Sequence, residues 1–176
     1  FRSGLNVIYS LQNRKRGFSK RNRIAPYLFT GIAYFQFDPR RKLDGTTYHL
    51  QQIGTEGQYL EGDYPEPYRL KQWAIPVGGG FTVKLNDFTD LGVETGFRKT
   101  FTDYLDDVST NYPDKLQLLA EQGSIAVELS DPSNDPSFPK GKPSGAKRGS
   151  PKQDDWYVYT NVNITWYFST YLFKAY

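Results

Sequence analysis

The strongest constraint on the fold is the segment WYVYTNVNITWYF at residues 156–168, whose side chains alternate between two faces. A period of two residues is typical of a β-strand that is apolar on one side. One face collects Trp156, Val158, Thr160, Val162, Ile164, Trp166 and Phe168. The other face collects Tyr157, Tyr159, Asn161, Asn163, Thr165 and Tyr167.

Four further segments carry strand patterns, so the sequence predicts an all-β fold of about five strands. These segments are 1–11, 24–37, 71–85 and 91–100, of which 24–37 is apolar on both faces. The connections alternate between short and long. The short ones are 12–23 and 86–90, and the long ones are 38–70 and 101–155.

The second long connection has two recognisable parts. Residues 115–129 (KLQLLAEQGSIAVEL) predict a short helix that is interrupted at Gly123. Residues 131–151 contain five prolines among Ser, Gly and Lys, a composition typical of a mobile loop.

Strand length and aromatic placement favour a membrane barrel over a soluble β-sandwich or a lipocalin-like barrel. The strands run roughly 11–15 residues, against about 5–6 in globular proteins. Trp156 and Trp166 are ten positions apart. At about 3.3 Å per residue and a tilt near 40°, that spacing spans roughly 25 Å, the height of an outer-membrane apolar band. Outer-membrane barrels also alternate short periplasmic turns with long outer loops.

Composition agrees with this interpretation. Aromatic residues make up 16% of the chain, and Tyr and Trp favour both strands and membrane interfaces. No apolar run is long enough for a transmembrane helix. The mean hydropathy of −0.66 disfavours a helical membrane protein but not a barrel, whose strands place only alternate side chains in lipid. The net charge of +3 does not indicate nucleic acid, and the absence of Cys excludes disulfides and thiolate sites.

A closed bacterial barrel needs at least about eight strands. We therefore expect residues 1–176 to form the C-terminal portion of a single barrel domain, with about three N-terminal strands outside this sequence or supplied by another chain. The absence of Met agrees with a missing N-terminus. With a periplasmic C-terminus, the long connections face outside and the short turns face the periplasm.

The two faces of the predicted strands have different roles. The lipid-facing belt is expected to include Trp73, Trp156, Trp166 and Phe168. The inward face carries Gly78, Gly80, Gly92 and Gly96, with Glu94 and Arg98. A narrow barrel is filled by side chains, so we expect Glu94 and Arg98 to join a buried charge network and the GGG at 78–80 to mark crowding or curvature. An ion path is the alternative.

Four segments together resemble the PorG-like outer-membrane β-barrel family of the Bacteroidota type IX secretion system. They are APYLFTGIAYFQFDP (25–39), LQQIGTEGQ (50–58), GFRKTFTDYLDDVSTNYPD (96–114) and DDWYVYTNVNITWYF (154–168). TFTDYLDDVS is the most specific of these. Family members are longer at the N-terminus, with a signal peptide and further strands.

The resemblance implies a non-enzymatic component of the bacterial outer membrane, without a cofactor. It implies two partners, the periplasmic ring lipoprotein (PorK/GldK-like) and its companion (PorN/GldN-like). It supplies no catalytic residues. The alternative is a stand-alone barrel that binds lipopolysaccharide or a surface ligand through 38–70 and 101–155.

Two charged segments are candidate sites. The basic turn has two interpretations: a solvated turn against anionic headgroups, or a docking point for the periplasmic ring. Its residues are Arg14, Lys15, Arg16, Lys20, Arg21 and Arg23. The acidic loop, which contains Asp103, Asp106, Asp107 and Asp114, has three: a calcium site at Asp103, Asp106 and Asp107, a folded cap, or a partner-binding surface. In such a cap, Asp side chains accept hydrogen bonds from nearby backbone N–H groups.

Enzyme interpretations find little support. His49 is the single histidine, and the chain has no G-x-S-x-G motif for a lipid hydrolase. Glu56, Glu61 and Asp63 could supply an acid/base pair, but solvated charges in a Gly- and Pro-rich loop are the favoured interpretation.

Overall fold

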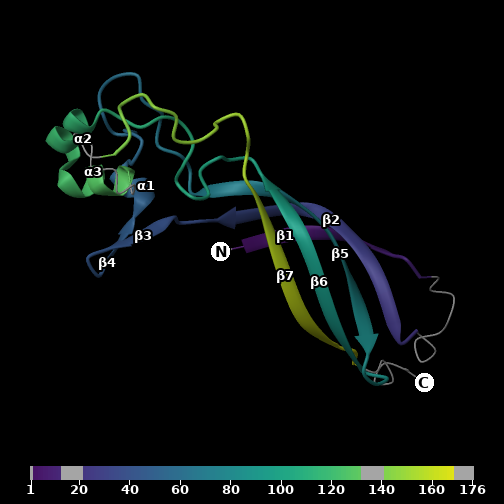
Figure 1. The fold of residues 1–176 in the computed structure, drawn as a ribbon. Coiled ribbons are helices and arrows are strands. Elements are labelled where there is room, and N and C mark those ends of the chain that lie inside the picture. Colours follow the sequence, from purple (N-terminus) through teal and green to yellow (C-terminus); the bar gives the residue numbers. More distant parts are fainter. Residues whose placement is uncertain (1, 13–21, 132–140, 169–176) are drawn as a thin grey trace, which may run out of the picture. The chain divides into compact units, whose positions relative to one another are not determined.

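The computed structural model describes residues 2–12, 22–131 and 141–168. The chain divides into two compact units. The sheet unit contains, of these, residues 2–12, 22–34, 73–99 and 156–168. The loop unit contains residues 35–72, 100–131 and 141–155, which are mainly the two long connections (Figure 1).

The sheet unit is built on five strands in the order β1-β2-β5-β6-β7, as the curved arrows in Figure 1 show. Their bounds are β1 Arg2–Ser10, β2 Ile24–Gln36, β5 Lys71–Lys84, β6 Thr89–Thr100 and β7 Trp156–Trp166. The prediction of an all-β antiparallel fold is confirmed, and each predicted strand is present within a few residues of its expected bounds.

The alternating patterns place the side chains as predicted. In the antiparallel pair β6–β7, Val93 lies opposite Val162 and Glu94 lies opposite Asn161. Apolar residues thus meet on one face and polar residues on the other, which is the arrangement that a period of two dictates. Residues 85–88 join β5 to β6, and the Leu85 N–H donates to the Thr89 carbonyl at 3.0 Å.

The first long connection contains structure that the sequence analysis missed. Strands β3 (Arg40–Leu43) and β4 (Thr46–His49) pair antiparallel, and α1 (Leu50–Ile53) follows at once. Asp44 and Gly45 join the strands with φ of 47° and 83°. Two positive φ values define the type I′ turn that favours Asp-Gly in two-residue hairpins.

The second long connection contains the predicted interrupted helix. Helix α2 spans Lys115–Gln122 and α3 spans Ser124–Ser130, with Gly123 between them at a φ of 86°. Asp114 caps α2, because its side chain accepts hydrogen bonds from the N–H groups of Leu116 and Gln117. Among the described residues, none of the helices has the length and apolar character needed to span a membrane.

The loop unit has its own apolar core. Leu60, Leu118 and Ala126 are buried together, so residues from both long connections meet there. Ile53, Tyr64 and Val127 pack around them. Tyr64 also donates a hydrogen bond to Gln117 at 2.9 Å.

The segment 131–151, predicted to be mobile, is described only in part. Residues 132–140 lie outside the described residues. On either side, Asp131 pairs with buried Lys115 at 2.7 Å, and Arg148 donates to the Ser130 carbonyl. Residue Asn111 forms a β-bridge with Lys147.

Candidate membrane face and loop-unit sites

One face of the sheet unit exposes apolar side chains along β5, β6 and β7. Trp73, Trp156 and Trp166 are 55%, 60% and 66% exposed. Further apolar side chains are exposed on the same strands: Ile75, Val77, Phe81, Phe97, Val158, Val162 and Ile164. A large exposed apolar surface on a folded chain marks a face that contacts lipid or another molecule.

Aromatic residues mark the ends of this face. The Trp73 ring lies 4.9 Å from the Tyr34 ring. The ammonium of Lys99 lies 5.0 Å from the ring of Trp156, at the start of β7. Phe168, just beyond the end of β7, is exposed. All four residues predicted for a lipid-facing belt are therefore accessible.

The opposite face of the sheet carries a polar network. Tyr27 donates a hydrogen bond to Glu94 at 2.9 Å. Arg98 donates to the Tyr157 hydroxyl at 2.8 Å and lies 4.5 Å from the Tyr159 ring. Within the described residues, Glu94 accepts hydrogen bonds from Tyr27 and Asn161, and Arg98 donates to Tyr157, while the buried Nε of Arg98 has no hydrogen-bond partner.

The glycines of this face are crowded, as predicted. A Cβ atom on Gly78 would lie 2.5 Å from the ring of Phe29 and 2.4 Å from the Thr95 carbonyl oxygen. One on Gly80 would lie 2.8 Å from the Tyr27 ring. The rings of β2 therefore occupy the space that side chains at these glycines would need.

The loop unit contains a buried cluster of three charged residues. Glu56 and Asp107 are both 0% exposed. Arg148 contacts both, with Nη1 3.0 Å from Glu56 Oε1 and Nη2 3.6 Å from Asp107 Oδ2. Buried carboxylates need such a partner, because an uncompensated charge in the interior is costly.

Hydrogen bonds satisfy both carboxylates. Glu56 accepts from the Ser109 N–H at 2.8 Å, the Thr110 hydroxyl at 2.7 Å and the Tyr104 hydroxyl at 3.1 Å. Asp107 accepts hydrogen bonds from the Tyr68 hydroxyl at 2.7 Å and from the Thr55 hydroxyl. Both donors come from the first long connection, far from Asp107 in the sequence. The cluster thereby ties the two long connections together.

Burial and hydrogen bonding shift the pKa values of groups in and around this cluster. Burial raises the pKa of Asp107, while hydrogen bonds from Thr55 and Tyr68 and the charge of Arg148 oppose that rise. Burial also raises the pKa of Tyr68, and it raises the pKa of Tyr104 to about 12. Both tyrosines therefore remain neutral donors near neutral pH.

The aspartates of the acidic loop lie in different environments. Asp107 belongs to the buried cluster, whereas exposed Asp106 accepts a hydrogen bond from the Val108 N–H at 3.1 Å. Asp103 is half-buried, and burial raises its pKa. The predicted bonding of Asp side chains to nearby N–H groups is confirmed at Asp106 and Asp114. Among the described residues, no group of three or more acidic or histidine side chains is placed to hold a metal.

The prediction of solvated charges was wrong for Glu56. It is buried because Arg148 and four hydrogen-bond donors surround it, whereas Glu61 and Asp63 are exposed. His49 contacts Asp38, with Nδ1 2.9 Å from the carboxylate. The histidine and Arg40 hold the pKa of Asp38 below its usual value.

Most of the basic turn lies outside the described residues. These residues are Arg14, Lys15, Arg16, Lys20 and Arg21. Arg23 is described and exposed, and its carbonyl accepts a hydrogen bond from the Lys84 N–H at 2.7 Å.

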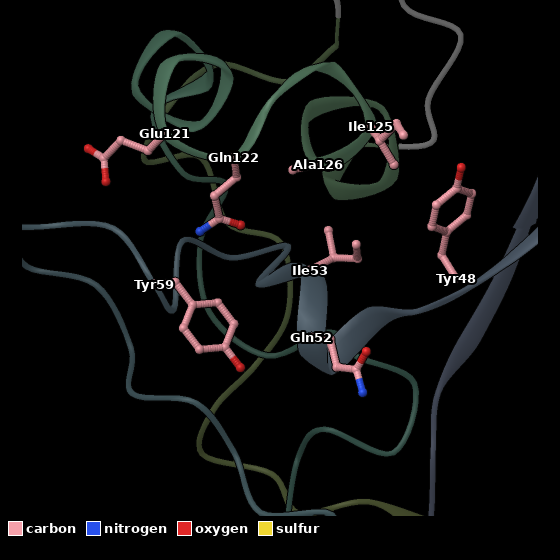
Figure 2. Close-up of a pocket in the computed structure, with 8 residues that line it drawn as sticks. All are labelled: Tyr48, Gln52, Ile53, Tyr59, Glu121, Gln122, Ile125 and Ala126. Atoms are coloured by element: carbon pink, nitrogen blue, oxygen red, sulfur yellow. The ribbon is translucent and has the colours of Figure 1, made fainter.

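The loop unit also has an open groove of about 510 Å³, which the sequence analysis did not predict. Figure 2 shows the side chains that line it. The first long connection contributes Tyr48, Gln52, Ile53 and Tyr59. Helices α2 and α3 contribute Glu121, Gln122, Ile125 and Ala126. No local motif signals this groove, because it forms where two distant segments meet.

Comparisons with known proteins do not identify a family for this chain. No family model matches the chain, and no curated protein or solved structure shows significant similarity to it.

Proposed function

We propose that the sheet unit is part of an antiparallel β-barrel that spans the bacterial outer membrane. The observation that carries this proposal is the exposed apolar face of β5, β6 and β7, with tryptophan near both ends of β7. The opposite face is polar and crowded by tyrosine rings. An apolar exterior and a filled polar interior are what lipid and a narrow barrel lumen require.

Closure of this barrel requires further strands. Within the described residues, β1 and β7 are the two edges of the sheet. An open edge in lipid leaves backbone N–H and C=O groups unpaired, at several kcal/mol each. The proposal is therefore a barrel of about eight strands, in which about three more strands join β1 to β7.

We further propose a non-enzymatic role in type IX secretion, linking the outer membrane to the periplasmic lipoprotein ring. This role rests on the PorG-like segments at 25–39, 50–58, 96–114 and 154–168. In the proposed topology, the basic turn faces the periplasm and docks on an acidic face of the ring.

Cross-linking tests this role. The tagged protein is isolated from outer membranes in mild detergent, and cross-linked peptides are identified by mass spectrometry. The proposal expects peptides of the ring lipoprotein to cross-link to Lys15 or Lys20. Cross-links to surface proteins from Lys142 and Lys147 alone would contradict both the role and the topology.

A second candidate is a stand-alone barrel that binds a surface ligand through its loops. It is favoured by one observation: the two long connections fold together around a shared core and form a groove. Deleting residues 46–60 separates the candidates. A secretion component keeps its ring cross-links, whereas a stand-alone binding protein loses its ligand.

A further inference from the structure

The groove of the loop unit combines ring faces, amide groups and one carboxylate. We propose that it binds a neutral oligosaccharide chain. The inference rests on the geometry of the loop unit alone, so it holds under either candidate function.

Two tyrosine rings border the groove, and aromatic rings are common packing surfaces for sugars. Tyr48 and Tyr59 lie on opposite sides of the open space in Figure 2. Pyranose rings present a C–H face that packs on an aromatic face, while their hydroxyls point sideways to polar groups. Rigid aromatic side chains supply this contact at a low conformational cost.

The groove is preformed at Tyr59. Its hydroxyl donates a hydrogen bond to the Gln51 carbonyl at 3.1 Å. Its ring lies over Gly54, where a Cβ atom would come within 2.6 Å of the ring. Gly54 adopts a φ of 67°, a conformation that glycine accepts readily. A ring held in place before binding loses little freedom when a ligand arrives.

An unsatisfied amide points to a polar ligand. The Nε2 atom of Gln122 is buried and has no hydrogen-bond partner among the described residues. Gln52 places a second amide in the lining. Amides both donate and accept, which matches hydroxyl groups that do the same. A turn of the Gln122 side chain into the groove would let a ligand oxygen accept from Nε2, which would remove the cost of leaving that donor unpaired.

Charge and polarity argue against other ligands. Among the residues that the structure describes, Glu121 is the one charged residue of the lining, and none of the lining residues is Lys or Arg. An anionic headgroup or phosphorylated glycan would therefore meet a like charge without a compensating cation. An apolar peptide helix would desolvate Gln52, Glu121 and Gln122 without offering them partners. A neutral chain of hydroxyls satisfies all three.

A glycan array tests the proposal on the full chain in detergent micelles. The array carries neutral oligosaccharides beside sialylated and phosphorylated ones, and a peptide array is run in parallel. The strongest neutral glycan is then titrated calorimetrically against Tyr48→Ala, Gln122→Ala and Glu121→Gln. The matched control is Gln153→Ala, whose side chain is exposed in the same unit outside the groove.

The proposal expects binding to neutral glycans, with a loss of at least about tenfold in affinity for Tyr48→Ala and Gln122→Ala, or about 1.4 kcal/mol. Gln153→Ala should bind as the native chain does. Glu121→Gln should not create affinity for phosphorylated glycans above that for neutral ones. Hydrogen exchange of α2 must be unchanged in each variant, so that a loss of binding is not a loss of fold.

Three results would overturn the proposal: binding to anionic glycans or peptides only, no glycan bound above background, or equal affinity in Tyr48→Ala and the control. None of them bears on the barrel proposal, which depends on the sheet unit.

Discussion

Arg148 contacts both buried carboxylates of the loop unit. Replacing it in Arg148→Met leaves Glu56 and Asp107 buried together without that cation. We expect the free energy of unfolding of the loop unit to fall by about 3–5 kcal/mol. All three tryptophans belong to the sheet unit, so tryptophan fluorescence does not report on the loop unit. Hydrogen exchange over residues 50–60 and 104–112, measured by mass spectrometry, reports the change instead.

The matched control is Arg40→Met. Arg40 pairs with Asp38, but its side chain is 56% exposed, so water already screens the interaction. We expect a loss below about 1 kcal/mol. Equal losses of unfolding free energy in the two arginine variants would show that the buried Arg148 ion pairs stabilise the fold no more than the exposed Arg40 ion pair does.

Asp103 provides a prediction with a defined pH dependence. Burial raises its pKa, a hydrogen bond with Ser109 opposes that rise, and the charges of nearby Asp155 and Asp106 add to it. A carboxyl group with a raised folded-state pKa binds its proton more tightly in the folded chain, so its ionisation lowers stability as pH rises above about 4. Asp103→Asn should therefore stabilise the loop unit at pH 7 by about 1 kcal/mol or less, because the group is partly exposed.

The stabilising effect of Asp103→Asn should vanish near pH 3, where the native carboxyl group is protonated. Asp63→Asn is the control, since Asp63 is exposed in the same unit and does not contribute to the pKa of Asp103. Hydrogen exchange at several pH values, corrected for intrinsic rates, measures both variants. A gain that persists at pH 3 would exclude ionisation as its cause.

At the scale of residues, sequence predicts what is local. The hydrogen bonds of Asp106 and Asp114 join groups two or three positions apart, so residue type and spacing suffice. Glu56 and Arg148 are 92 positions apart, and no pattern in either segment identifies the other as its partner.

At the scale of elements, the period of the apolar side chains predicted the strands of the sheet unit. The five strands of the sheet unit have the period that the side-chain alternation requires. The break at Gly123 separates α2 from α3 as expected. The hairpin β3–β4 was missed because its strands have four residues each, although Asp44-Gly45 is a strong turn signal.

Helix α2 depends on its cap. Asp114→Ala removes the acceptor of two N–H groups in the first turn, and we expect about 1 kcal/mol less stability in α2. Asp114→Asn keeps an acceptor and should lose far less. Hydrogen exchange at residues 115–122 compares the two variants, and equal protection in both would exclude the cap as a source of stability.

Two glycines with positive φ allow a test of the packing between Gly54 and the Tyr59 ring. Gly54→Ala and Gly145→Ala each place a side chain at a φ near 70°, which costs about 1–2 kcal/mol. A Cβ at Gly54 also meets the Tyr59 ring, whereas one at Gly145 meets nothing within 4 Å. We expect the larger loss of thermal stability in Gly54→Ala. A larger loss in Gly145→Ala would contradict the described packing of Tyr59.

At the scale of the whole molecule, the sequence predicts the sheet better than the loop unit. Alternation gives each strand its two faces, but the packing of residues 35–72 with residues 100–131 and 141–155 around one core depends on contacts between distant segments. We propose that the apolar face of the sheet contacts lipid. Trp73, Trp156 and Trp166, all exposed on that face, are natural reporters of it.

The most direct test is tryptophan quenching of the full-length native protein in bilayers of brominated lipid. If the apolar face contacts lipid, we expect strong quenching by lipids brominated near the headgroups and little quenching by aqueous iodide. Trp156→Phe and Trp166→Phe should each remove part of the signal, because they lie near opposite ends of β7. Quenching by iodide alone, with no effect of brominated lipid, would contradict the membrane assignment.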